Sequence, residues 1–176
     1  MTPFSPPGRA TAALLTLLMS AGIAHASLVP LSTEDLARSA PLVVRGTVEE
    51  TRSRFTPDGS LIVTFSAVRV EETYRGSHPR RRLVVETEGG EVGDVGLVVT
   101  DAAVLKEGDR VVLFLAPGRS ATGRSVYRVV GEAQGAYRVG DDGVARKDGF
   151  HVEGDPSIVD FEIPLADLAR RAREAR

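Results

Sequence analysis

The stretch Arg110-Val111-Val112-Leu113-Phe114-Leu115 sets five apolar residues in a row behind a single charge. A short run of β-branched and aromatic residues favours a strand in the interior of a sheet. Val112 and Phe114 point to one face of such a strand and their neighbours to the other, so one or both sets should be buried. The turn-forming residues Lys106-Glu107-Gly108-Asp109 precede it. We therefore expect a central strand here, in a β-rich domain.

The segments before this strand also follow β patterns. Leu42–Val48 predicts a strand in which Gly46 indicates a bulge or bend. Leu61–Tyr74 alternates between apolar and polar residues, and the turn residues Thr56–Ser60 before it predict that the two strands form a hairpin. Arg81–Glu88 predicts a third strand. Shorter strands are expected at Tyr127–Gly131 and Ala136–Val139.

Two short helices are expected to flank the strands. Ser32 followed by Asp35 is typical of a capping box at the start of a helix that Pro41 ends. Near the other end of the chain, apolar residues at spacings of three and four predict an amphipathic helix. Its apolar stripe consists of Leu165, Leu168, Ala169 and Ala172.

These elements predict a mainly β fold: a small OB-like barrel of five to six strands with a short N-terminal helix and a C-terminal amphipathic helix. The alternative is an immunoglobulin-like sandwich of seven strands. Residues 27–150 are expected to form the barrel domain and residues 151–176 a C-terminal linker and helix.

Residues 1–26 have the three-part pattern of a secretory signal peptide. Arg9 provides the basic region, Ala10–Ile23 the apolar region, and Ala24-His25-Ala26 the small residues before a cleavage site at Ser27. The alternative is an uncleaved membrane anchor, which needs about 20 apolar residues. We therefore expect a secreted or periplasmic protein with no membrane insertion after cleavage.

Composition limits the possible partners. Loss of Arg9 with the signal changes the formal charge from −2 to −3, so no strong positive field gathers nucleic acid, and we expect none as a partner. The chain has no cysteine, so no disulfide can stabilise it. Lys106 and Lys147 are its two lysines and asparagine is absent, which indicates a GC-rich, bacterial coding sequence.

Catalytic motifs are missing from the sequence. Outside the signal, the histidines are His78 and His151, both in segments typical of solvent-facing loops. No zinc-ligand spacing, nucleophile elbow or thiol is present. We therefore expect no enzyme activity, no cofactor and no metal. The alternative is a hydrolase that uses carboxylates such as Glu86 and Glu88.

Gly89–Gly96 is rich in glycine, which favours a sharp connection between strands. It lacks the Gly-Lys-Ser/Thr ending of a phosphate-binding loop. A calcium site is the alternative, because oxygen ligands suit that cation, although their spacing matches no EF-hand. The candidate ligands are Glu86, Glu88, Glu91 and Asp94.

Arg80-Arg81-Arg82 forms a local basic run. It is interpreted either as a solvated entrance to the third strand or as a contact for an acidic partner.

Three segments together resemble the netrin-like module, the OB fold of the tissue inhibitors of metalloproteinases: Ala40–Val48, Val70–Gly76 and Leu105–Leu115. With Gly131–Val139 following, the same layout resembles exported bacterial proteins that contain this OB-like domain, and the resemblance covers residues 40–139. The resemblance implies an OB-like barrel and a protein-binding function.

One departure from those inhibitors affects the expected mechanism. They chelate a protease zinc through an N-terminal cysteine held by disulfides, whereas the mature chain here would start with Ser27 and Leu28. Ser27 corresponds to that cysteine only as a first residue, so zinc-directed inhibition is not carried over.

The expected function is an exported, non-catalytic protein-binding module, either a protease inhibitor or an accessory to a secreted protease. Its partner would be another exported protein. A carrier of a lipid or another small ligand is the further alternative and would require an apolar cavity. The candidate partner-binding residues are Ser27, Leu28, Arg80, Arg81 and Arg82.

Overall fold

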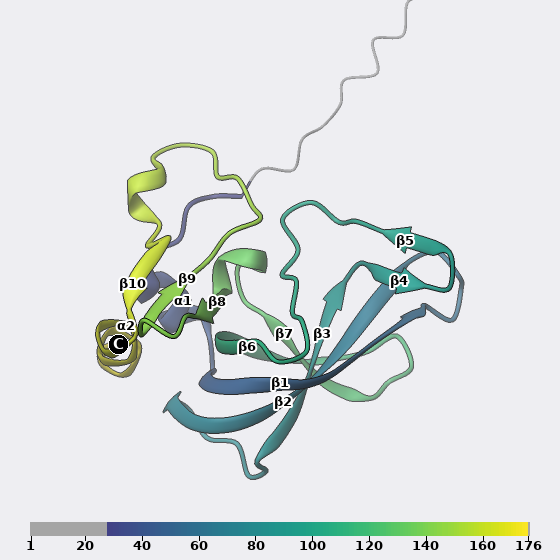
Figure 1. The fold of residues 1–176 in the computed structure, drawn as a ribbon, viewed down its shortest axis with the longest axis horizontal. Helices are drawn as coiled ribbons and strands as arrows, with labels where there is room; N and C mark the ends of the chain where they lie inside the picture. Colours follow the sequence, from purple (N-terminus) through teal and green to yellow (C-terminus); the bar gives the residue numbers. More distant parts are fainter. Residues whose placement is uncertain (1–27, 176) are drawn as a thin grey trace, which may run out of the picture.

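The computed structural model describes residues 28–175, so the expected signal segment 1–26 and Ser27 lie outside the described residues. The fold is mainly β with two α-helices (Figure 1). β1 (Leu42–Phe55) and β2 (Ile62–Arg75) are its longest strands, and Phe55 pairs with Ile62 next to the turn. The predicted hairpin is therefore confirmed.

The other strands fall into two sheets. The main sheet also contains β3 (Arg82–Glu88), β6 (Arg110–Arg119), β7 (Ser125–Val129), β8 (Ala136–Val139), β9 (Val144–Arg146) and β10 (Glu162–Pro164). β4 (Gly90–Val92) and β5 (Val95–Leu97) form a separate two-stranded sheet. The helices are α1 (Thr33–Ser39) and α2 (Leu165–Glu174), with 3-10 turns at Glu132–Gly135 and Pro156–Ile158.

The strand order in the main sheet is β1-β2-β3-β7-β6-β8-β9-β10, with a further pairing between β1 and β6. The pairings thus run from β1 through β2, β3, β7 and β6 and back to β1. The β3–β7 pairing is parallel and consists of Val85 opposite Tyr127, whereas the others are antiparallel. β8, β9 and β10 continue the sheet beyond β6.

The main sheet has eight strands, more than the five to six expected for the barrel, because β9 and β10 have three residues each and are too short for an alternating pattern to predict them. Gly89–Gly96 is more than a connection, since it contains most of the β4–β5 hairpin. Each strand of the main sheet is hydrogen-bonded to its neighbours in the strand order, so the sheet is continuous. A sandwich would instead have two separate sheets packed face to face.

Gly46 marks an irregularity in β1, as its place in the sequence predicts. The register with β2 shifts between Arg45 and Gly46. A β-carbon at this position would lie 2.3 Å from the backbone oxygen of Arg69. The close approach of the two strands therefore requires glycine.

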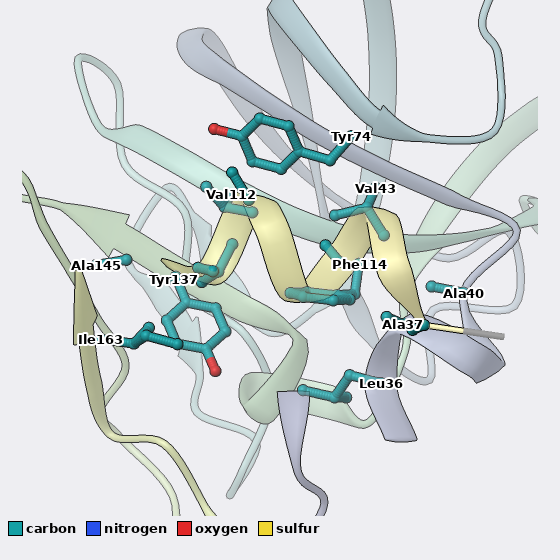
Figure 2. Packing of buried hydrophobic residues seen from close by; sticks show 14 residues of the cluster. Leu36, Ala37, Ala40, Val43, Tyr74, Val112, Phe114, Tyr137, Ala145 and Ile163 are labelled. Atoms are coloured by element: carbon teal, nitrogen blue, oxygen red, sulfur yellow. The ribbon is translucent and has the colours of Figure 1, made fainter. Parts of the chain in front are cut away.

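The first half of β1 and the apolar run of β6 are buried on both faces, which explains the unbroken apolar run in Arg110–Leu115. On one face, Val43, Val112 and Phe114 pack with α1 and α2 in a cluster that we call the helix-side core (Figure 2). The other face belongs to the strand-side core. Its members are Leu42, Val44, Val48, Val68, Leu83, Val85, Leu105, Val111, Leu113 and Leu115.

The helices follow the predicted patterns. Ser32 caps α1, and its hydroxyl accepts a hydrogen bond from the Asp35 amide at 3.1 Å, while the Asp35 carboxylate accepts from the Ser32 amide. In α2, Leu168, Ala169 and Ala172 are buried in the helix-side core. Figure 1 shows both helices at the same side of the molecule. No helix within residues 28–175 has the length and apolar character needed to cross a membrane.

Candidate functional site

Three neighbouring depressions cover the outer side of β1, β2, β3, β7 and the end of β6, with volumes of about 540, 770 and 260 Å³. Val84 lines the first two, Phe65 the first and third, and Arg119 the second and third. They therefore form one continuous surface, which we call the arginine face. Its charged residues are Arg52, Arg54, Arg80, Arg82, Arg119, Arg124 and Arg128, with Glu50, Glu86 and Glu88.

The arginine face concentrates positive charge on a chain whose overall charge is negative. Seven arginines and three glutamates give it a surplus of four positive charges, whereas the whole chain carries −2. Such a local surplus attracts anionic groups even where the overall charge does not.

Four arginines of this face are available for a partner. Within residues 28–175, Arg54, Arg80, Arg119 and Arg124 form no ion pair with a carboxylate, whereas Arg128, for example, is paired with Glu86. Arg54 lies over the Phe65 ring, 4.1 Å from its centroid. Arg119 donates to the Gly123 carbonyl oxygen at 3.0 Å. All four can therefore bind an incoming anion without breaking a salt bridge.

Strand alternation explains why side chains of β2 and β3 line the arginine face. In β3, Leu83 and Val85 belong to the strand-side core, so Val84 and Glu86 point the other way. In β2, Val68 is in the same core and Phe65 lines the arginine face. The twist of the long strands brings the two hairpin tips to this side of the molecule (Figure 1).

The third depression, which we call the hairpin cleft, lies between the tips of the β1–β2 and β6–β7 hairpins. Glu86 lines it and has only 8% of its surface exposed. Its Oε1 accepts a hydrogen bond from Arg128 Nη2 at 2.6 Å. Its Oε2 is buried without a hydrogen-bond partner. The apolar residues of the cleft are Phe55, Pro57, Leu61, Val63, Phe65 and Ala121.

Both hairpin tips are held by their own hydrogen bonds. Asp58 accepts from the Thr56 hydroxyl at 2.6 Å and from the Ser60 hydroxyl at 2.9 Å, and these bonds lower the pKa of Asp58 to about 2. At the other tip, the Ser120 hydroxyl accepts from the Arg124 amide at 3.1 Å. The two turns that border the cleft are therefore stabilised by contacts of their own, without a ligand.

The structure separates the predicted partner-binding residues. Arg80 and Arg82 line the arginine face, and Arg82 also pairs with Glu49 at 3.3 Å. The Arg81 side chain is exposed but is not among the residues lining the three depressions. Leu28 packs elsewhere, near Phe150 and Val159 in a small separate cluster. Ser27 lies outside the described residues.

The histidines and carboxylates do not assemble a metal site in the described part of the chain. His78 is half-buried, contrary to the expectation of a solvent-facing loop, because its Nδ1 lies 3.1 Å from the Tyr127 hydroxyl. His151 is exposed as expected. Residues 28–175 contain no group of three or more His, Asp or Glu side chains placed to hold a metal ion, so Glu91 and Asp94 do not join Glu86.

A second polar cluster is buried beside the helix-side core. Lys147 has 5% of its surface exposed, and its Nζ donates to the Gln134 carbonyl oxygen at 3.0 Å and lies 4.4 Å from the centre of the Tyr137 ring. Burial lowers the pKa of Lys147 to about 7. Burial likewise raises the pKa of the Tyr137 hydroxyl.

Asp160 connects this cluster to both helices. It accepts from the Thr33 hydroxyl at 2.8 Å and from Arg171 Nη1 at 3.0 Å. Burial acts to raise the pKa of Asp160, but the hydrogen bonds from Arg171 and Thr33 outweigh it and lower the pKa. Because every one of these groups has a protein partner, the cluster is explained as a structural connection between α1, α2 and β8.

No protein-family model matches the sequence, and none of the curated proteins is similar to it.

Proposed function

We propose that this chain is an exported, non-catalytic module that binds another exported protein through its arginine face. The proposal includes an OB-like barrel formed by β1, β2, β3, β7 and β6. The return of the pairings from β6 to β1 and the parallel β3–β7 pair support that barrel. The resemblance of residues 40–139 to the netrin-like module supports it independently.

The observation that carries the proposal is the set of four arginines without carboxylate partners on one surface. Guanidinium groups form paired hydrogen bonds with carboxylates, and arginine is enriched at protein interfaces. The expected partner segment is therefore acidic. The proposed role is that of a protease inhibitor or of an accessory to a secreted protease. If the protein is an inhibitor, Ser27 and Leu28 are also proposed to contact the protease.

Two alternatives have specific tests. A carboxylate hydrolase is favoured by the presence of Glu86 and Glu88 in one cleft. Turnover of an ester, glycoside or peptide that disappears in Glu88→Gln would support it over a binding module. A carrier would need an apolar cavity, whereas the buried apolar side chains of the strand-side core pack against one another between the strands. Lipid that copurifies with the protein in stoichiometric amount would support the carrier.

The main experiment captures partners from the native exported fraction with the full mature chain and identifies them by mass. Arg54→Glu/Arg124→Glu should weaken capture of the principal partner at least tenfold, and rising salt should weaken wild-type binding. Lys106→Glu/Arg110→Glu changes the net charge equally outside the arginine face and is the matched control. Equal binding by both variants would contradict the proposal.

A further inference from the structure

We infer that the hairpin cleft receives a tyrosine side chain from the acidic partner segment, with the tyrosine hydroxyl donating to Glu86 Oε2. This inference rests on the proposed binding of an acidic protein segment by the arginine face. It adds a site of defined chemistry at one end of that face.

The first observation is the unsatisfied oxygen of Glu86. Oε1 is bound by Arg128, but Oε2 is buried and has no partner. A buried acceptor left unpaired is destabilising, and such groups are rare in folded proteins. A donor that reaches this oxygen would therefore be bound strongly, more so because the acceptor is a carboxylate.

The second observation is the charge around that oxygen, which selects the kind of donor. Arg54, Arg119 and Arg128 line the same small cleft as Glu86 and Glu88. The surplus of positive charge disfavours a lysine or arginine side chain from the partner. A neutral hydroxyl donor meets no such repulsion.

The third observation is the apolar wall of the cleft, which favours an apolar group as the part of the side chain that carries the hydroxyl. Phe55 and Leu61 are 43% and 41% exposed, and with Val63 and Phe65 they border the cleft. An aromatic ring would cover this apolar surface, and tyrosine combines a ring with a hydroxyl at its far end. A volume of about 260 Å³ admits one side chain but no larger element.

The same residues indicate how the site opens. Because Oε2 is closed to solvent, a bordering side chain must move before a ligand can reach it. Arg119 is exposed, lines the cleft and has no carboxylate partner within residues 28–175, whereas Arg128 is held by Glu86 Oε1. Acidic residues beside the tyrosine would draw the Arg119 guanidinium outward, so the charged contacts and the tyrosine site would act together.

The test measures binding of the full mature chain to three fluorescent peptides by anisotropy. The peptides are identical runs of Asp and Glu around a central Tyr, Phe or Ala. We expect the Tyr peptide to bind roughly tenfold more tightly than the Phe peptide, and the Phe peptide more tightly than the Ala peptide.

Two variants locate the effect. Glu86→Met removes the acceptor at nearly constant size and should abolish the preference for Tyr over Phe. Leu61→Ala changes an exposed wall residue and should weaken the Tyr and Phe peptides while leaving the Ala peptide unchanged. Val98→Ala, at an exposed position outside the arginine face, is the control and should behave as wild type.

The outcomes separate the two proposals. Equal, salt-sensitive binding of all three peptides would overturn the tyrosine site and leave the acidic-partner proposal standing. A Tyr preference that survives in Glu86→Met, with the variant folded by circular dichroism, would also overturn it. If no peptide binds but the native partner is still captured in an arginine-dependent way, the tyrosine site alone is overturned. If no peptide binds and capture does not depend on the arginines, both the tyrosine site and the acidic-partner proposal are overturned.

Discussion

The hydroxyl oxygens of Thr33 and Tyr137 lie 3.0 Å apart in a buried hydrogen bond that spans 104 positions of the sequence. Thr33 donates its proton to Asp160, so Tyr137 is the donor to Thr33. This chain of bonds connects the first turn of α1 to β8. The helix is thereby fixed on the sheet by directed contacts as well as by apolar packing.

Tyr137→Phe should lower the free energy of unfolding by about 0.5–1.5 kcal/mol, because it removes one hydrogen bond. Thr33→Val should cost more, about 1–3 kcal/mol, since Tyr137 and Asp160 both lose a partner. Urea unfolding followed by circular dichroism measures both. A Thr33→Val protein as stable as wild type would show that these bonds do not stabilise the fold.

Phe114→Ala should lower the free energy of unfolding by about 3–5 kcal/mol, because the ring is fully buried in the helix-side core. Phe55→Ala is the control, since that ring is 43% exposed, and it should lower the free energy of unfolding by less, about 1–2 kcal/mol. Thermal or urea unfolding compares them. A loss below about 1 kcal/mol in Phe114→Ala would mean that β6 is not central.

Gly46→Ala should destabilise the protein by about 1–3 kcal/mol, because the added β-carbon would collide with the Arg69 backbone oxygen. Gly96→Ala is the control, since its β-carbon would meet the Glu91 side chain at 3.7 Å. The difference between the two midpoints of urea unfolding gives the effect. Equal midpoints would contradict the close approach of β1 and β2.

Lys147 should make stability rise with pH. Its pKa is about 7 in the folded chain and near 10.5 ordinarily, so between these values the unfolded state binds more protons. The gain is up to about 1.4 kcal/mol per pH unit. Above pH 10 the raised pKa of Tyr137 acts in the opposite direction.

Urea unfolding of wild type and Lys147→Met at intervals from pH 7 to pH 9.5 checks this dependence. The variant should show a flatter profile, because methionine has no proton to release. Identical profiles for the two proteins would show that Lys147 stays charged in the folded state.

The proposed export predicts a defined mature end. N-terminal sequencing of protein recovered from the medium or the periplasm should begin at Ser27, because small residues occupy the positions that a signal peptidase recognises. Intact Met1 in the soluble exported fraction would contradict cleavage at this site.

Local patterns in the sequence were sufficient for the elements whose signals are local. Ser32 and Asp35 predicted the start of α1, and Thr56–Ser60 predicted the turn between β1 and β2. The apolar run of β6 indicated a buried central strand. In each of these cases, the residues that determine the structure lie within a few positions of one another.

The candidate site depends instead on distant pairings. Arg128 and Glu86 are 42 positions apart, and they meet because β7 lies beside β3. Two residues of the basic run Arg80–Arg82, Arg80 and Arg82, line the arginine face. Among residues 28–175, the remaining unpaired arginines of this face, Arg54, Arg119 and Arg124, lie in hairpin segments that have no distinctive sequence motif. A sequence pattern cannot show which surface arginines share a face until the strand order is known.

The first half of β1 and the apolar run of β6 lie between two packed layers, and this arrangement determines how the molecule unfolds. The amides of Val43, Val44, Val112 and Leu113 are covered from both sides, so their exchange with deuterium should require global unfolding. The helical layer cannot detach without exposing strands on which the other core also depends. The two cores should therefore unfold as a single cooperative unit, even though they share no residue.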